Sequence, residues 1–336
     1  MLPIDSHAAG WLGGLGATLL AACACAHAPC AAPSTAAPVL PEAWETPLQR
    51  KHPLVGRIYD VRAGRYVAPM ALEAAAASAH FLFLGETHDN PDHHRLQAWL
   101  VRAAAAAGRR PALAFEMLDT GQQAAVDAAL AAPDRSADAV ARAVAWDRSG
   151  WPRFSMYRPV FAAGLELGLP IVAANLPRSV VRAVVERGRA ALPEPLQRSL
   201  ARDEPLPPAL RESLRAEMAE AHCGRLPAAL LDPMALAQRA RDAEMALRLV
   251  AADHGGGAIL VAGAGHARVD RGVPAQVARE APGRSSLSVA FLEASASRCA
   301  PPAYAEEYSA ARLPFDYVVF TPAAEREDPC RSIHLK

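Results

Sequence analysis

Short apolar runs alternate with stretches of helical character over most of the 336-residue chain, and this rhythm sets the fold class. Each run is about four to six residues long, which suits a buried strand better than a buried helix. Strands that crossover helices cover on both faces need such continuous apolar sequence. We therefore expect an α/β fold whose mostly parallel sheet is flanked by helices, preceded by a small hairpin at 56–67 and a helix at 71–79. The expected strands of the sheet are 80–84, 112–115, 171–174, 258–262, 287–292 and 317–320.

The helix after the first apolar run has a clear start. Asn90 can cap it, and Asp92 complements the dipole of its first turn. In that frame His94 and Gln97 lie three residues apart and share a face. His93 is expected to be a solvated residue of the first turn.

Between residues 178 and 253 the strand rhythm stops. Three helical stretches take its place, at 179–191, 208–222 and 233–252. We therefore expect a helical subdomain at 179–253, inserted into an α/β domain formed by 46–178 and 254–325.

The charges of the chain balance, with 35 Lys and Arg against 35 Asp and Glu, and no basic face is apparent. A nucleic-acid-binding surface needs clustered cations to neutralise phosphates. We therefore expect no nucleic acid as a partner.

The N-terminal residues predict export. An apolar run at 11–22 is too short to span a membrane and suits the core of a signal peptide, assigned to 1–22. Leu20-Ala-Ala-Cys23 resembles a bacterial lipobox, so Cys23 is expected to be lipidated and to begin a tether at 23–45. This predicts an outer-membrane lipoprotein of the cell envelope, anchored in the membrane by lipid. The alternative is a soluble periplasmic protein cleaved near 26–32, because the first ten residues contain no Lys or Arg.

Three cysteines lie in the body of the chain, without the paired CxxC spacing of a zinc ribbon. In an oxidising compartment, Cys299 and Cys330 could close a late loop and leave Cys223 free.

Side chains that can carry chemistry follow several of the predicted strands. Glu86 and His88 come after the first run, Glu116 after the second, and His266 just after the fourth. The carboxyl ends of parallel strands meet at one edge, where open α/β sheets bind ligands. Two imidazoles and two carboxylates can bind a divalent metal and hold a water. Each residue alone has an ordinary structural explanation, but together they predict one shared site.

Further segments could complete that site. The third run ends at Asn175 and Arg178, and the segment 146–160 is rich in aromatic residues. Trp151 and Tyr157 could line a flat apolar pocket there, or the segment could simply pack a helix. One face of the stretch 233–252 carries Gln238, Arg241, Asp242 and Met245. That face could close over the site, or it could form an ion-pair network that binds no ligand.

These motifs together resemble the ChaN family of haem-binding lipoproteins, which is similar to the Tiki proteases and to erythromycin-esterase-like proteins. The resemblance runs from about residue 54 to residue 320. The matching motifs are Gly85-Glu-Thr-His-Asp-Asn-Pro-Asp-His-His with Gln97, Phe115-Glu-Met117, Gly150-Trp-Pro with Tyr157, Ala174-Asn-Leu-Pro-Arg178, Gln238-Arg-Ala-Arg-Asp-Ala-Glu-Met245 and Gly263-Ala-Gly-His266.

The resemblance implies a role in haem or iron uptake, and in some members a pair of stacked haems between two subunits. It therefore implies haem as cofactor and a homodimer formed on haem binding. A tyrosine is the implied iron ligand, and Tyr157 is the candidate because it follows the Trp-Pro motif. Alternatives are Tyr304, Tyr308 and His94. No CxxCH is present, so covalent c-type attachment is excluded.

The haem pocket implied by the resemblance would use Tyr157, His94, Trp151, Arg178 and Asn175, with Arg153, Arg158 or Arg178 meeting the propionates. Its candidate iron donors are Tyr157, His88, His266 and Glu116. The alternative function is a metal-dependent hydrolase of the Tiki type, loaded with Mn, Co or Zn. In that reading Glu86 or Glu116 is the general base, while His88 and His266 bind the metal or stabilise charge. No HExxH helix is present, so such an enzyme would not be a standard zincin.

Overall fold

The computed structural model describes residues 30, 40, 43–202 and 204–332. These residues contain one eight-stranded sheet with the strand order β2-β1-β8-β7-β3-β6-β4-β5. The six strands from β8 to β5 are parallel, and β1 and β2 form an antiparallel edge. The α/β prediction is confirmed. The strands are β1 Ile58–Asp60, β2 Arg65–Val67, β3 Phe81–Glu86, β4 Ala112–Asp119, β5 Ile171–Asn175, β6 Ala258–Gly263, β7 Ser286–Glu293 and β8 Tyr317–Thr321.

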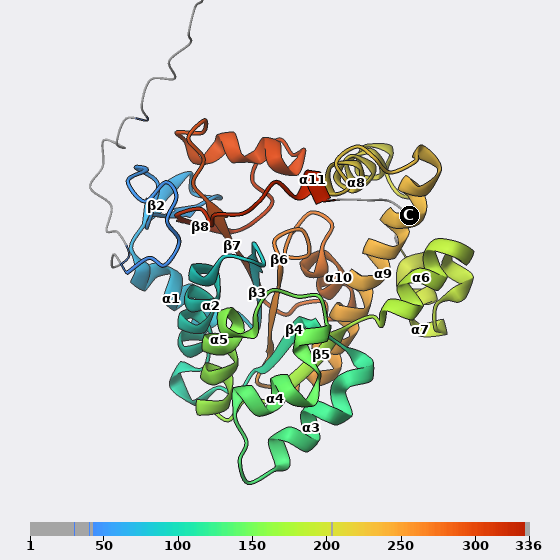
Figure 1. Cartoon of the computed structure of the whole chain (residues 1–336), viewed down its shortest axis with the longest axis horizontal. Coiled ribbons are helices and arrows are strands. Elements are labelled where there is room, and N and C mark those ends of the chain that lie inside the picture. The colour runs from blue at the N-terminus through green and yellow to red at the C-terminus, as the bar shows by residue number, and fades with distance from the viewer. Residues whose placement is uncertain (1–29, 31–39, 41–42, 203, 333–336) are drawn as a thin grey trace, which may run out of the picture.

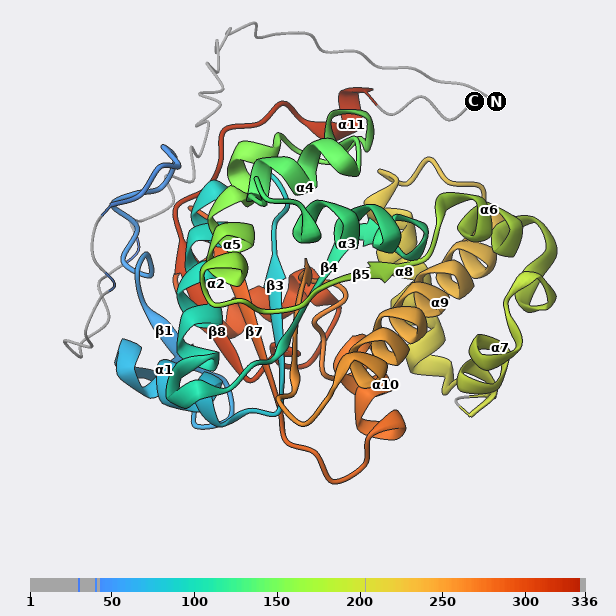
Figure 2. The same cartoon turned by 90° about the horizontal axis from the view of Figure 1, so that it is seen from below.

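Helices cover both faces of this sheet, as Figures 1 and 2 show. Helices α1, α2 and α5 pack on one face, and α9 and α10 pack on the other. The helices are α1 Pro69–Ser78, α2 Pro91–Ala104, α3 Gln123–Ala131, α4 Ala137–Ala143, α5 Phe154–Glu166, α6 Arg178–Arg187, α7 Glu194–Ala201, α8 Pro208–Ala221, α9 Ala228–Ala252, α10 Val273–Glu280 and α11 Pro329–Ser332.

The continuous apolar sequence of β3 explains this three-layer arrangement. Successive side chains of a strand point to opposite faces. Leu82 and Leu84 pack with α2 and α5, whereas Phe81 and Phe83 pack with α9 and α10. A strand with polar residues at alternate positions would leave one of these helical layers without a partner.

The helical stretch predicted at 179–253 forms α6, α7, α8 and α9. Helix α9 packs against α6, α7 and α8, but it also contacts β4, β5 and β6 of the sheet. It therefore connects the inserted helices to the main layers. The division into a separate subdomain at 179–253 stays a prediction. No helix in the described ranges is long and apolar enough to cross a membrane.

The start of α2 follows the predicted cap but differs in the placement of His93. The Asn90 side chain accepts a hydrogen bond from the Asp92 amide at 3.0 Å. His93, expected to be solvated, is instead fully buried, so that expectation was wrong. Its Nδ1 accepts from the Thr87 amide at 2.9 Å, and its Nε2 lies 2.9 Å from the Thr321 hydroxyl. These contacts tie the turn after β3 to β8, and burial lowers the pKa of His93 to about 3.

The disulfide prediction was also wrong. The structure links Cys30 to Cys299 and Cys223 to Cys330. Cys223 ends the turn after α8, and Cys330 lies in α11, so the second disulfide ties the C-terminal segment to the inserted helices. Spacing along the chain favoured a local loop, but the fold brings α8 and α11 side by side (Figure 1).

We expect Cys223→Ser combined with Cys330→Ser to lower the free energy of unfolding by about 2–4 kcal/mol, because the disulfide closes a long loop. The two cysteines are 107 residues apart in sequence. Urea unfolding of the oxidised proteins measures the change. A non-reducing peptide map that linked Cys299 to Cys330 would contradict the pairing.

Candidate functional site

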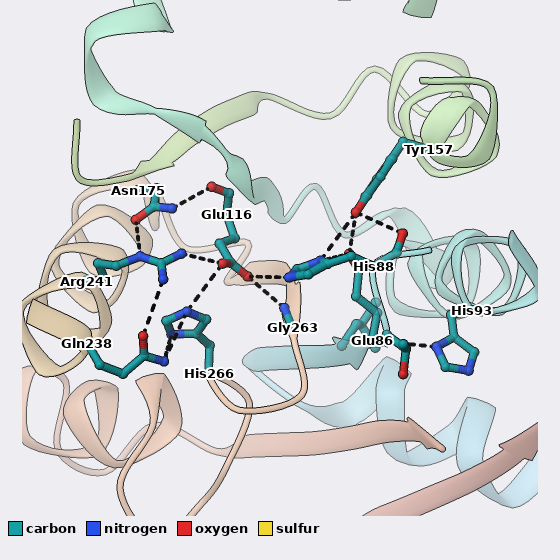
Figure 3. A network of polar contacts seen from close by, with 12 residues as sticks. Glu86, His88, His93, Glu116, Tyr157, Asn175, Gln238, Arg241, Gly263 and His266 are labelled. Carbon is teal, nitrogen blue, oxygen red and sulfur yellow. Dashed lines mark hydrogen bonds and ion pairs between the residues drawn. The ribbon is translucent and has the colours of Figure 1, made fainter. Parts of the chain in front are cut away.

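Three neighbouring strands end at the candidate site. Strand β6 lies between β3 and β4, so Glu86 at the end of β3 and Glu116 in β4 flank Gly263 at the end of β6. The pairing of β4 with β5 is irregular between Phe115 and Asp119, just where Glu116 lies. A bulge there re-aims the side chain that follows the regular ladder. Figure 3 shows the Glu116 carboxylate pointing toward His88.

Glu86 is buried and lies at the centre of one half of the site. Its Oε1 accepts from the Tyr157 hydroxyl at 2.8 Å and lies 2.8 Å from His88 Nδ1. Its Oε2 accepts from the Gln97 amide at 2.6 Å and lies 3.1 Å from His94 Nδ1. Each oxygen of this carboxylate therefore already has two protein partners.

The charges around Glu86 are balanced by imidazoles. Burial alone would raise the pKa of Glu86, but His94 and His88 lower it far below its usual range. Burial alone would lower the pKa of each imidazole, yet the pKa of His88 is raised by Glu116 and Glu86, and the pKa of His94 by Glu86. A carboxylate buried in this way is stable only with such partners.

Glu116 forms the other half of the site. Its Oε1 accepts from Arg241 Nη2 at 2.5 Å and lies 3.3 Å from His266 Nε2. Its Oε2 accepts from the Gly263 amide at 2.7 Å. Asn175 fixes the same corner, because its amide donates to the Glu116 carbonyl at 2.9 Å and its oxygen accepts from Arg241 Nε at 3.1 Å. The pKa of Glu116 is held well below its usual range by His266 and Arg241 against the effect of burial.

His266 completes this half through α9. Its Nδ1 lies 2.5 Å from Asp242 Oδ1, and Gln238 Nε2 lies 3.3 Å from its Nε2. The polar face predicted on this helix therefore reaches the site, whereas Met245 is buried in the core. Burial alone would lower the pKa of His266, but Glu116 and Asp242 raise it to about 9.

His88 joins the two halves and is partly exposed, more so than Arg241, whose side chain is 22% exposed. Its side chain is 33% exposed, against 5% or less for those of Glu86, Glu116, His94 and His266. Its Nε2 lies 3.9 Å from Glu116 Oε2, beyond hydrogen-bond distance. A Cβ at Gly263 would lie 3.0 Å from that Nε2, so the glycine keeps the space beside it open. The Trp151 ring packs edge-on against the imidazole, with centroids 4.9 Å apart.

The other predicted haem contacts are buried or fully engaged. Tyr157 is fully buried, packs against His94 with tilted rings at a centroid distance of 3.9 Å, and donates to Glu86. Both nitrogens of His94 have partners, since Nε2 lies 3.0 Å from the His88 carbonyl oxygen. Burial, followed by the charge of Glu86, raises the pKa of the Tyr157 phenol far above its usual range. Its hydroxyl is a neutral donor here rather than a phenolate.

The remaining candidates differ in their exposure and in their partners. Arg178 is exposed and donates to the Ser149 carbonyl, beside Trp151. Arg158 instead pairs with Asp138 at 2.8 Å. Tyr304 is fully buried against Phe320 on the α9 side of the sheet. The other residues of the aromatic segment mainly pack a helix: Trp146, Phe154 and Phe161 form its cluster with Tyr157.

The carboxylates of this site are not arranged as metal ligands. In the part of the chain that the structure describes, no three His, Cys, Asp or Glu side chains are placed to hold a metal ion. Glu86 and Glu116 instead bind imidazole, guanidinium, amide and phenol donors. The metal-loaded hydrolase therefore has no support from this geometry. Sequence reasoning missed the role of Gly263, which was named only as part of the Gly263-Ala-Gly-His266 motif. Its place at a strand end, three residues before His266, was the available signal.

The comparisons with known proteins agree with the motifs. The model of the family described as "Haem-binding uptake, Tiki superfamily, ChaN" matches residues 72–277, more than half of the chain. The chain belongs to this family. No curated protein matches it.

The ChaN fold is also seen in a solved structure. ChaN of Campylobacter jejuni, solved with cofacial haem, has 20% identity and a TM-score of 0.61 over 78% of this chain and 95% of that one. Weaker similarity is found to the type III effector HopBA1, with 15% identity and a TM-score of 0.39 over 75% of this chain and 91% of that one. Erythromycin esterase EreC in its open conformation has 16% identity and a TM-score of 0.39 over 67% and 72%. The likeness to ChaN of Campylobacter jejuni shows the fold of this ChaN-family chain.

The raised pKa of His266 predicts a pH dependence of stability. The pKa rises from 6.5 to about 9 on folding, so protonated His266 stabilises the fold fully below pH 6.5. This contribution, on the order of 3 kcal/mol, is lost as the pH rises through about 9. Urea unfolding of the wild type and of His266→Asn should therefore converge at high pH. His254→Asn, at an exposed site, is the matched control. A difference between wild type and His266→Asn that stays constant from pH 6 to 10 would contradict this account.

Proposed function

We propose that this ChaN-family protein binds haem at the opening beside His88 and that His88 Nε2 ligates the iron. Family membership supports haem as the ligand. His88 is chosen because it combines an exposed ring with an Nε2 that makes no hydrogen bond in the described residues. Haem bound there would supply an iron that accepts a nitrogen or oxygen donor.

The hydrogen bond at the other side of the His88 ring is the observation that carries this proposal. A histidine that ligates a metal typically donates its second ring N–H to a carboxylate, which fixes the tautomer and raises ligand basicity. His88 Nδ1 lies 2.8 Å from Glu86 Oε1. With the Nδ1 proton held by that oxygen, Nε2 carries the lone pair that faces the open space beside Gly263.

Tyr157 has a positioning role in this proposal. Its hydroxyl donates to the same oxygen of Glu86 that holds His88, and its ring is fully buried. Ligation by Tyr157 would require that hydrogen bond to break and the phenol to ionise while buried. Gln97, on the other oxygen of Glu86, anchors the carboxylate from α2.

The surroundings of His88 suit a flat, anionic cofactor. Trp151 presents a partly exposed indole beside the imidazole. Arg178 lies close to the backbone that precedes Trp151, because a Cβ at Gly150 would be 3.2 Å from its Nη2. A guanidinium there can meet a propionate with two parallel hydrogen bonds.

Hemin titration, followed by the Soret and visible bands, tests the proposal. We expect His88→Ala to weaken hemin binding at least about tenfold and to change the band positions, because the axial ligand is lost. Gly263→Ala should also weaken binding, since its Cβ would crowd His88 Nε2. Tyr157→Phe should keep the wild-type band positions, and the exposed His254→Ala should leave both affinity and bands unchanged. Wild-type bands retained by His88→Ala but lost in Tyr157→Phe would establish tyrosine ligation instead.

We also propose that the protein is attached to the cell envelope by lipid on Cys23, which lies outside the described residues. The lipobox-like sequence that ends at Cys23 supports this attachment. Cys23→Ser should abolish incorporation of labelled palmitate and release the protein from membranes of the expressing bacterium. Cys25→Ser, at the neighbouring cysteine, should do neither. Membrane association that survives in Cys23→Ser would contradict the proposal.

A further inference from the structure

The segment from Trp44 to Arg57 forms a fixed loop on the side of the sheet where α1 and α2 pack. The Asp92 carboxylate holds it, accepting from the Glu45 amide at 2.9 Å, the Thr46 amide at 2.9 Å and the Thr46 hydroxyl at 2.5 Å. Asp92 is itself buried in the first turn of α2. The loop is therefore anchored to the main fold, and the walls of its cavities are held in place.

A cavity of about 520 Å³ within this loop is lined by cations. Arg50 and Lys51 contribute positive charges, and among the described residues no Asp or Glu lines it. The volume falls within the range of small-molecule sites. An anion entering this cavity would meet these two cations and no carboxylate of the described residues.

Arg50 is held in place by neutral groups. Its guanidinium donates to the carbonyls of Thr46, Trp44 and Glu45 at 2.7 to 3.0 Å. It makes no ion pair with a carboxylate among the described residues, so these bonds orient its charge without neutralising it. Lys51 is exposed beside it.

His52 lines the same cavity. Its Nδ1 accepts from the Leu54 amide at 3.3 Å, and burial lowers the pKa of its ring. The neutral ring therefore carries its proton on Nε2, which is buried without a hydrogen-bond partner in the described structure. His52 is only 9% exposed, and an unsatisfied donor at such a position costs free energy.

Trp44 also lines a second, apolar groove of about 600 Å³. The far wall of the groove contains Leu96 and Trp99, and Pro69 borders it next to Met70, which is 77% exposed. Its two carboxylates already have partners, since Glu73 accepts from the Trp99 indole at 2.5 Å and Asp92 holds the loop. Trp44 thus separates a cationic cavity from an apolar groove.

We propose that this surface binds an anionic lipid, with the phosphate headgroup in the Arg50–Lys51–His52 cavity and the apolar chain in the groove between Trp44 and Trp99. The positive charge of the cavity favours an anionic headgroup. The adjoining apolar groove favours a ligand with an apolar part over free phosphate. Trp44 lines both the cavity and the groove. Its indole suits this boundary between a polar and an apolar region.

Binding of short-chain lipids by the whole protein tests this proposal. Dihexanoylphosphatidic acid, kept below its micelle concentration, is compared by titration calorimetry with inorganic phosphate and with zwitterionic dihexanoylphosphatidylcholine. Intrinsic tryptophan fluorescence provides a second readout. We expect phosphatidic acid to bind at least about tenfold more tightly than either of the other two probes.

Charge and groove variants assign the two parts of the ligand. Lys51→Glu, at an exposed position, should weaken phosphatidic acid binding at least about tenfold, whereas the same charge change in Arg187→Glu should leave it unchanged. Trp44→Ala should reduce the affinity for phosphatidic acid to that for inorganic phosphate. Hemin affinity should not change in Lys51→Glu, which separates this surface from the haem site.

Three results would overturn the proposal. Equal affinity of Lys51→Glu and wild type would remove the cavity as the headgroup site. Equal binding of inorganic phosphate and phosphatidic acid, unaffected by Trp44→Ala, would identify a free-phosphate site. Equal binding of phosphatidylcholine would show that headgroup charge is not what the surface recognises.

Discussion

The burial of two carboxylates at neighbouring strand ends is the constraint on which the functional half of this structure depends. Glu86 and Glu116 are both almost inaccessible to solvent, and each must be matched by donors or carry a large desolvation cost. Glu86 is matched from α2 and α5, through His94, Gln97 and Tyr157. Glu116 is matched from α9 and the turn after β6. The two helical layers and the sheet therefore meet at the site, so that disturbing one carboxylate disturbs the docking of several elements.

His88 is the point where this buried network becomes accessible. It approaches both carboxylates, because its Nδ1 lies 2.8 Å from Glu86 Oε1 and its Nε2 lies 3.9 Å from Glu116 Oε2. The same two carboxylates favour the protonated form of His88. A ligand that takes the Nε2 lone pair therefore competes with protonation. The buried carboxylates of Glu86 and Glu116 thus set the basicity of the partly exposed His88 imidazole, and with it the strength of His88 as a ligand.

The sequence predicted the sheet well, because apolar runs with β-propensity and flanking helical stretches leave few other folds. All six predicted strands of the parallel sheet begin within one residue of β3 to β8 and end within four residues of them, and Asn90 caps α2 as expected. The convergence of Glu86, His88, Glu116 and His266 followed from the rule that parallel strands end at one edge. The failures concerned side chains whose partners are distant in sequence. Nothing local to His93 reveals that Thr321 lies next to it, and nothing local to Cys223 reveals α11. The end of the tether was likewise placed at residue 45, because nothing local to Glu45 and Thr46 reveals that Asp92, 46 residues beyond Thr46, anchors them.

Resonance Raman spectroscopy of the hemin complex tests most directly whether the exposed histidine of this network is the haem ligand. The protein is prepared in two forms, one with ¹⁵N-labelled histidine and one with ring-deuterated tyrosine. The proposed site predicts an iron–ligand mode that shifts with labelled histidine and is absent in His88→Ala, with no band from iron–phenolate. An iron–phenolate band that shifts with labelled tyrosine and disappears in Tyr157→Phe would contradict it.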